Sequence, residues 1–110
     1  MIQKVYRDYI QDMIEAINDI ESFVAGLSFE QFMNDKKTVN AVIRSFEVMG
    51  EAAKNLPEAI VSQTKAVPWK KIAGMRDKLI HEYFGVDLET VWQTIKEDLP
   101  IVKPLIMRLQ

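Results

Sequence analysis

The stretch of sequence that decides the fold is IQKVYRDYIQDMIEAINDIESFV, residues 2–24. Its apolar side chains recur at intervals of three and four residues, which is the period of a helix with one apolar face. They are Ile2, Tyr6, Tyr9, Ile10, Met13, Ile17, Ile20 and Val24. Gly26 follows closely and is a natural stop for a helix. We therefore expect a long amphipathic helix that ends before Gly26.

Capping residues predict the next two helices. Ser28, followed by Glu30 and Gln31, has the pattern of an N-cap with its capping partner and predicts a short helix over residues 29–33. Asp35 can cap a third helix in the same way. The apolar stripe of that helix consists of Val39, Val42, Ile43, Phe46, Met49, Gly50 and Ala53, and we expect the helix to end at Leu56, before Pro57. Its small residues Gly50, Ala52 and Ala53 would let a neighbouring helix approach closely.

The second half of the chain is also predicted to be helical. We expect one or two helical turns and then a loop over residues 57–67. Pro68 suits the start of a fourth long helix from residue 69 to about residue 83, with Gly85 as its stop. Asp87 can cap a fifth helix, whose apolar register is Leu88, Val91, Trp92, Ile95 and Leu99. Pro100 and Pro104 bracket a last apolar piece over residues 101–109.

These elements predict an all-α protein. The sequence has no strand pattern and no internal repeat, and short connections force neighbouring helices to run in opposite directions. With 110 residues and 48% hydrophobic side chains, the chain has material for one core. We expect an antiparallel up-and-down bundle of four to five helices that forms a single domain over residues 1–110.

Charge and composition exclude several functional classes. The absence of cysteine excludes disulfides and zinc sites of the cysteine type. A net charge of −2 argues against a protein that coats nucleic acid by charge alone. A local contact stays open, because residues 65–78 carry five basic side chains and one acidic one, whereas residues 1–35 have a net charge of −5. The chain shows no signal-peptide core and no membrane-spanning stretch, so we expect a soluble protein of the cytoplasm.

The chemistry-bearing stretch is RDKLIHEY, residues 76–83, which holds the only histidine. With one histidine and no cysteine, we expect no metal site. The sequence also has no glycine-rich phosphate loop, so we expect no cofactor. Arg76, His81 and Tyr83 together could hold a phosphate and move a proton, which is the minimum for cutting RNA by its own 2′-hydroxyl. Structural interpretations also exist: an ion-pair partner for Arg76, an exposed helix-end histidine for His81, and a rim residue for Tyr83.

The motif R-x-x-x-x-H-x-Y lies within GMRDKLIHEYFGVD, after AVIRSFEVMGEAAKNLP and PWKKI, and this order of blocks resembles the HepT-like branch of the HEPN domains. The resemblance implies that Arg76 and His81 are the catalytic ribonuclease pair and that Tyr83 is the third residue of the motif. It also implies metal-independent RNA cleavage by a homodimer. A partner minimal nucleotidyltransferase would act as antitoxin by adenylylating Tyr83, as in a type VII-like toxin–antitoxin pair.

Helix geometry separates the two catalytic candidates. At about 100° per residue, His81 lies about 140° around the helix from Arg76. Either the helix loosens before Gly85, or a two-fold dimer brings Arg76 and His81 of facing copies to a shared cleft, which we prefer. We expect the third and fourth helices to form the dimer contact, because their apolar residues exceed what one small bundle must cover. These residues are Phe46, Met49, Gly50, Ala53, Ile72 and Met75.

Several supporting roles and alternative functions stay open. Arg44, Glu47 and Glu51 share one polar helix face and either orient Arg76 and His81 or form only surface ion pairs. Trp69 and Trp92 are interpreted as anchors of the core or of an interface. The alternative to a ribonuclease is a non-catalytic nucleotide- or RNA-binding helical module that docks a partner protein, and the third possibility is a dimeric scaffold.

Overall fold

All secondary structure in the described part of the chain is helical. The computed structural model describes residues 2–81 and 87–110, with side chains for residues 6–78 and 87–110. The elements are α1 (Ile2–Val24), α2 (Phe29–Met33), α3 (Lys36–Lys54), α4 (Glu58–Gln63), α5 (Trp69–His81), α6 (Leu88–Gln93), the π-helical segment η2 (Thr94–Asp98) and α7 (Leu99–Met107). The predicted all-α bundle is thereby confirmed.

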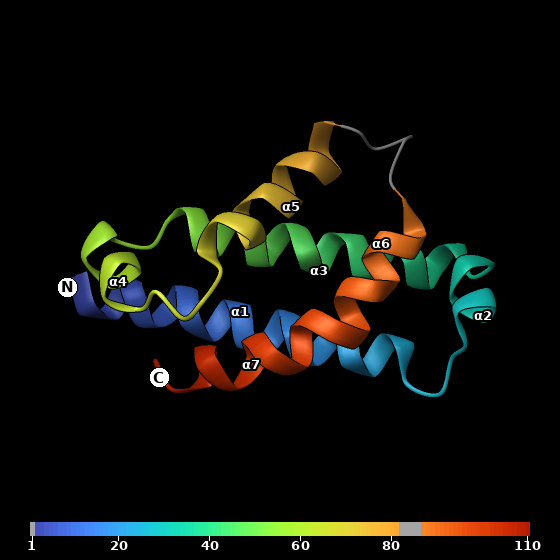
Figure 1. Cartoon of the computed structure of the whole chain (residues 1–110), viewed down its shortest axis with the longest axis horizontal. Helices are drawn as coiled ribbons and strands as arrows, with labels where there is room; N and C mark the ends of the chain where they lie inside the picture. The colour runs from blue at the N-terminus through green and yellow to red at the C-terminus, as the bar shows by residue number, and fades with distance from the viewer. Residues whose placement is uncertain (1, 82–86) are drawn as a thin grey trace.

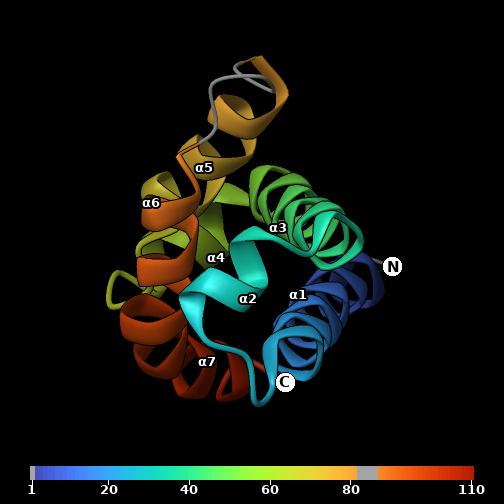
Figure 2. The same ribbon diagram turned by 90° about the vertical axis from the view of Figure 1, so that its right-hand side faces the viewer.

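Helices α1 and α3 are the two longest helices and form an antiparallel pair on one side of the bundle (Figures 1 and 2). Helix α7 lies along α1, and α5 packs on α3. The last turns of α5 project from the bundle in both views (Figures 1 and 2). The two chain ends are also joined, because the Tyr6 hydroxyl donates a 2.9 Å hydrogen bond to the carbonyl oxygen of Leu109. No helix within the described residues is long and apolar enough to cross a membrane.

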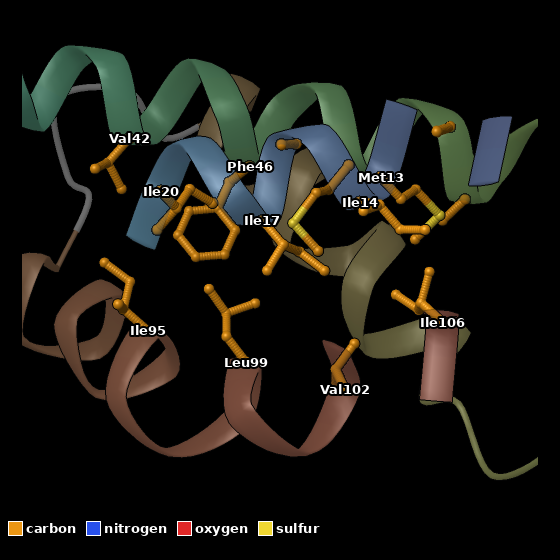
Figure 3. Packing of buried hydrophobic residues seen from close by; sticks show 14 of the residues in the cluster. Met13, Ile14, Ile17, Ile20, Val42, Phe46, Ile95, Leu99, Val102 and Ile106 are labelled. Atoms are coloured by element: carbon orange, nitrogen blue, oxygen red, sulfur yellow. The ribbon is translucent and has the colours of Figure 1, made fainter. Parts of the chain in front are cut away.

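The core lies between α1, α3 and the helical run from residue 88 to residue 107. Figure 3 shows side chains of the three elements facing one another, with Phe46 pointing toward Leu99. Met13, Ile17 and Ile20 are completely buried, as the apolar period of the first helix predicts. Burying one such side chain contributes about 1.5–3 kcal/mol to stability. The core therefore fixes the position of α3, and α3 in turn is the helix against which α5 packs.

The helix starts follow the predicted caps. The Ser28 hydroxyl accepts a 3.1 Å hydrogen bond from the Gln31 amide, and the Gln31 side chain accepts one of 2.9 Å from the Ser28 amide. The Asp35 carboxylate accepts from the amide of Thr38 at 3.2 Å and from its hydroxyl at 2.7 Å. The hydroxyl bond is the main reason that the pKa of Asp35 lies below its usual value. Gly26 has a φ of +76°, a conformation that L side chains rarely adopt, and α1 ends before it.

Two boundaries differ from the prediction. Helix α3 ends at Lys54 rather than Leu56, because Asn55 forms its C-cap. The last piece is not bracketed by prolines: Pro100 lies in the first turn of α7 and Pro104 lies inside it. Both prolines are exposed, so carbonyl groups without a helical donor can be hydrated there. The wide π-helical turn η2, directly before this segment, has no signature in the apolar period.

Candidate functional site

Arg76 lies on α5 and is held by two carboxylates. Its Nη2 atom is 2.9 Å from Oε2 of Glu51 on α3, and its Nη1 atom is 3.1 Å from Oδ1 of the adjacent Asp77. The Arg76 side chain is only 24% exposed. An ion-pair partner on the third helix, one of the interpretations open for Arg76, is therefore present and is Glu51. The guanidinium donates one hydrogen bond, from Nη1 to Asp77, and meets Glu51 as an ion pair, so other N–H donors stay available to a ligand.

Asp77 connects Arg76 to a second basic residue. Lys54, the last residue of α3, places its Nζ 2.9 Å from the Asp77 Oδ1 atom that also contacts Arg76. Hydrogen bonds from Lys54 and then from Arg76 hold the pKa of the Asp77 carboxyl below its usual value. Glu51, Arg76, Asp77 and Lys54 thus form a continuous series of charges, here called the Arg76 ion-pair chain. Exposed ion pairs of this kind contribute little to the stability of a fold, so the main effect of the Arg76 ion-pair chain is to orient the guanidinium.

A glycine lets α5 come close enough to α3 for these pairs. A Cβ atom built on Gly50 would overlap the Cβ of Arg76, and it would lie 2.8 Å from Arg76 Cγ and 3.2 Å from the carbonyl oxygen of Ile72. At position 50 of α3, only glycine leaves room for α5 to pack this closely. The predicted close approach at this small residue is confirmed.

A pocket of about 250 Å³ lies beside Arg76, between α1, α3 and α5. It is lined by Tyr9, Asp12, Arg44, Glu47, Val48, Glu51, Ala52, Asn55 and Arg76, and is here called the Arg76 pocket. Three carboxylates face two arginines, so its lining has a net charge of −1. Within the described residues, no three histidine, cysteine or carboxylate side chains are grouped so that they could hold a metal ion.

The remaining motif residues are placed only in part. His81 is the last residue of α5, whose helix is regular from Trp69 to this point. At about 100° per residue, its backbone position is about 140° around the helix from that of Arg76. No loosening of the helix occurs up to His81. Tyr83 and Gly85 lie outside the described residues.

The three polar residues of α3 have different roles. Glu51 contacts Arg76, as one of the two interpretations requires. Arg44 and Glu47 form a long pair, with 3.8 Å between Nη1 and Oε2. The pocket brings Tyr9, Asp12 and Asn55 beside them, and the sequence interpretation missed these three. The sequence analysis placed Tyr9 on the apolar face of the first helix, and the only signal for Asp12 and Asn55 was their polarity on predicted helices.

Both tryptophans pack against the core, Trp69 as a buried residue and Trp92 as a half-buried one. Trp69 is buried and its indole N–H donates a 2.9 Å hydrogen bond to the Thr64 hydroxyl. The Trp92 ring lies with its centroid 5.1 Å from that of Phe32 and 6.0 Å from that of Phe29. Their interpretation as core anchors is confirmed.

Most of the apolar residues predicted to be left uncovered by a single bundle are in fact covered, so that prediction is wrong for them. Phe46, Met49, Gly50 and Ala53 are buried within the single chain. Ile72 and Met75 are half-buried and line, with α7 residues, an apolar pocket of about 210 Å³. Ile101, at the rim of this pocket, is 66% exposed. The apolar surface that stays exposed is therefore on α5 and α7, while Phe46 and Met49 of α3 line the same pocket as buried residues.

Comparison with known proteins identifies the family. The chain matches the family described as "Ribonuclease HepT-like" over residues 13–109. It is 48% identical over 102 residues to "Probable ribonuclease HepT" of Thermococcus cleftensis, which covers 93% of each chain. It is 46% identical over 100 residues to "Putative RNase MJ0127" of Methanocaldococcus jannaschii, covering 91% of this chain and 83% of that one. No solved structure matches. This chain therefore belongs to the HepT-like ribonuclease family.

Proposed function

We propose that this chain is a metal-independent endoribonuclease toxin of a type VII-like toxin–antitoxin pair, with Arg76 and His81 as its catalytic residues. Family membership supports the ribonuclease activity. The observation that carries the assignment of Arg76 is its fixed guanidinium, held by Glu51 and Asp77 at the edge of a pocket. Incubation of the purified chain with single-stranded RNA in EDTA tests the activity. Cleavage is the expected result, and intact RNA under all buffer conditions would contradict it.

The reaction needs one proton acceptor, one proton donor and a cation. The 2′-oxygen of the substrate attacks the neighbouring phosphorus while a His81 imidazole accepts its proton. The bond from phosphorus to the 5′-oxygen breaks, and that oxygen receives a proton from an imidazolium. The products are a 2′,3′-cyclic phosphate and a 5′-hydroxyl. Arg76 stabilises the extra negative charge on the phosphate oxygens in the transition state.

A homodimer would reconcile this reaction with the helix geometry. Because α5 is regular through His81, Arg76 and His81 of one copy start from different sides of the helix. Two facing copies would combine both residue types in one cleft and provide two histidines, one as base and one as acid. The projecting end of α5 and the uncovered apolar surface of Ile72, Met75 and Ile101 support this arrangement.

We expect the purified chain to be dimeric at micromolar concentration. Burying an apolar surface between copies drives association. Multi-angle light scattering should give twice the mass of the 12.7 kDa chain, and Ile101→Lys should shift the protein toward monomer. Ser62→Lys, a substitution on the exposed face of α4, serves as the control. A wild-type monomer at this concentration would remove the shared-cleft account.

Tyr83 is proposed as the site of control by a partner minimal nucleotidyltransferase. Adenylylation there would add phosphate charge seven residues after Arg76 in the sequence and would repel the RNA backbone. We expect co-expression with the partner to add nucleotide-sized mass to the peptide with Tyr83 and to silence cleavage. Tyr83→Phe should escape this silencing. Modification of Tyr6 or Tyr9 instead, or full silencing of Tyr83→Phe, would contradict the mechanism.

One observation favours the alternative of a non-catalytic nucleotide- or RNA-binding module that docks a partner protein. The Arg76 guanidinium is already neutralised by two carboxylates, and the adjoining pocket is net negative. These carboxylates reduce the positive charge that Arg76 can offer to a transition-state phosphate, whereas the pocket could still take up the uncharged base of a nucleotide. RNA that is bound with micromolar affinity but stays intact would favour this alternative.

A further inference from the structure

The Arg76 pocket is poorly suited to hold a phosphate. Asp12, Glu47 and Glu51 outnumber the arginines in its lining, so a phosphate inside it would face net negative charge. If Arg76 contacts the scissile phosphate, as in the proposed function on which this inference rests, the phosphate lies at the rim. The interior is then left for an uncharged part of the substrate.

Glu47 is the least exposed of the three carboxylates that line the pocket, since Asp12 and Glu51 are both exposed. Its side chain is only 27% exposed, but its nearest cationic partner among the described residues is Arg44, at 3.8 Å. The Arg44 side chain is 73% exposed, so this contact is weak. The Glu47 carboxylate is half-buried, keeps contact with water and has no close donor in the described part of the chain, so a ligand that supplies N–H groups can replace that water.

The other walls suit a flat ring. Tyr9 contributes a half-buried aromatic side chain from α1. The Asn55 amide nitrogen donates to the Glu51 backbone oxygen at 2.8 Å and to Glu51 Oε1 at 3.3 Å, which leaves its Oδ1 as an acceptor. The volume of about 250 Å³ lies below the range of about 300–1,000 Å³ of pockets for drug-sized ligands. A single planar base fits this description better than a larger ligand.

We propose that the Arg76 pocket receives an unpaired RNA base next to the cleaved phosphate, and that Glu47 selects guanine there. Proteins read single-stranded RNA by taking unstacked bases against aromatic side chains and bonding their Watson–Crick edges. Guanine presents two adjacent donors, N1–H and N2–H, to the two oxygens of a carboxylate. Adenine, cytosine and uracil each place an acceptor beside their donor, and this acceptor repels the second carboxylate oxygen.

The experiment measures base selectivity without cleavage. The full chain, labelled with ¹⁵N, is titrated with the four nucleoside 5′-monophosphates, which share the phosphate and differ in the base. We expect GMP to bind about tenfold more tightly than the other three and to shift signals of residues around Tyr9, Glu47 and Asn55. Glu47→Gln should reduce the preference to within about twofold. Glu97→Gln, which removes an exposed charge from η2, should leave it unchanged.

Each outcome decides the proposal. Equal affinities for the four nucleotides in the wild-type chain would overturn it, as would shifts confined to other surfaces or unchanged GMP preference in Glu47→Gln. If Glu47→Gln does not fold, two other measurements decide the proposal. One is the nucleotide selectivity of the wild-type chain, and the other is the affinity of Glu47→Asp, whose shorter side chain should weaken the binding of GMP but not of the other three nucleotides. Cleavage of RNA with equal nucleotide affinities overturns only this inference. Selective GMP binding without RNA cleavage overturns only the proposed function.

Discussion

Replacing Arg76 or His81 by alanine is expected to lower the rate of RNA cleavage about a hundredfold or more while the chain stays folded. Proton transfer by a placed side chain and stabilisation of transition-state charge each contribute at least this much. The ion pairs that Arg76 loses with Glu51 and Asp77 are partly exposed and contribute little to stability. Initial rates on a labelled RNA, with melting followed by circular dichroism, measure both effects.

Two further variants make this test specific. Arg76→Lys keeps the charge but loses the planar guanidinium that bridges two carboxylates, so we expect it to stay strongly impaired. Arg108→Ala removes an exposed arginine at the end of α7 and should cleave at the wild-type rate. Wild-type rates in Arg76→Ala or His81→Ala, in a preparation free of other nucleases, would refute the catalytic assignment.

The largest expected loss of stability comes from Gly50→Ala. Its new Cβ would overlap Arg76 and crowd the backbone of α5, so the two helices must separate. Overpacking of this kind typically costs about 1–3 kcal/mol. Replacing glycine by alanine in a helix gains at most about 1 kcal/mol in helix propensity, so the net effect is a loss of stability at the upper end of the cost. The Arg76 ion-pair chain would also be displaced, so we expect weaker RNA cleavage. Urea unfolding and cleavage rates measure the two consequences.

Gly74→Ala is the matched control on α5. A Cβ at Gly74 has no heavy atom within 4 Å, and the residue lies in a helix. The same chemical change is therefore expected to be neutral or to stabilise the protein by about 0.5–1 kcal/mol. If Gly50→Ala proves as stable and as active as Gly74→Ala, the close approach at Gly50 does not position Arg76.

Local features of the fold could be predicted because their causes lie within a few residues. Gly26 ends α1, and Ser28 and Asp35 bond to amides three residues further along the chain. The close packing at Gly50 was also predictable, since a missing side chain is visible in the sequence. The sequence does not show which helix fills that space or with which residue, because α3 and α5 are brought together only by the tertiary fold.

Longer-range features of the site escaped prediction for the same reason. The Arg76 pocket joins Tyr9 and Asp12 of α1 to Asn55 after α3, and no local pattern connects them. The sequence predicts an interface for apolar residues such as Phe46, because a local pattern does not show which apolar face of the same chain covers them. In the structure Phe46 points toward Leu99, the first residue of α7. The uncovered surface lies instead on α5 and α7.

The chemical nature of the RNA ends tests the central claim most directly. A short single-stranded RNA is cleaved by the purified chain in EDTA, and the products are identified by mass spectrometry, beside the same RNA with 2′-deoxy sugars. The account predicts a 2′,3′-cyclic phosphate and a 5′-hydroxyl, no cleavage of the deoxy substrate, and loss of these products in Arg76→Ala and His81→Ala. Products with 5′-phosphate and 3′-hydroxyl ends, or cleavage of the deoxy substrate, would contradict it.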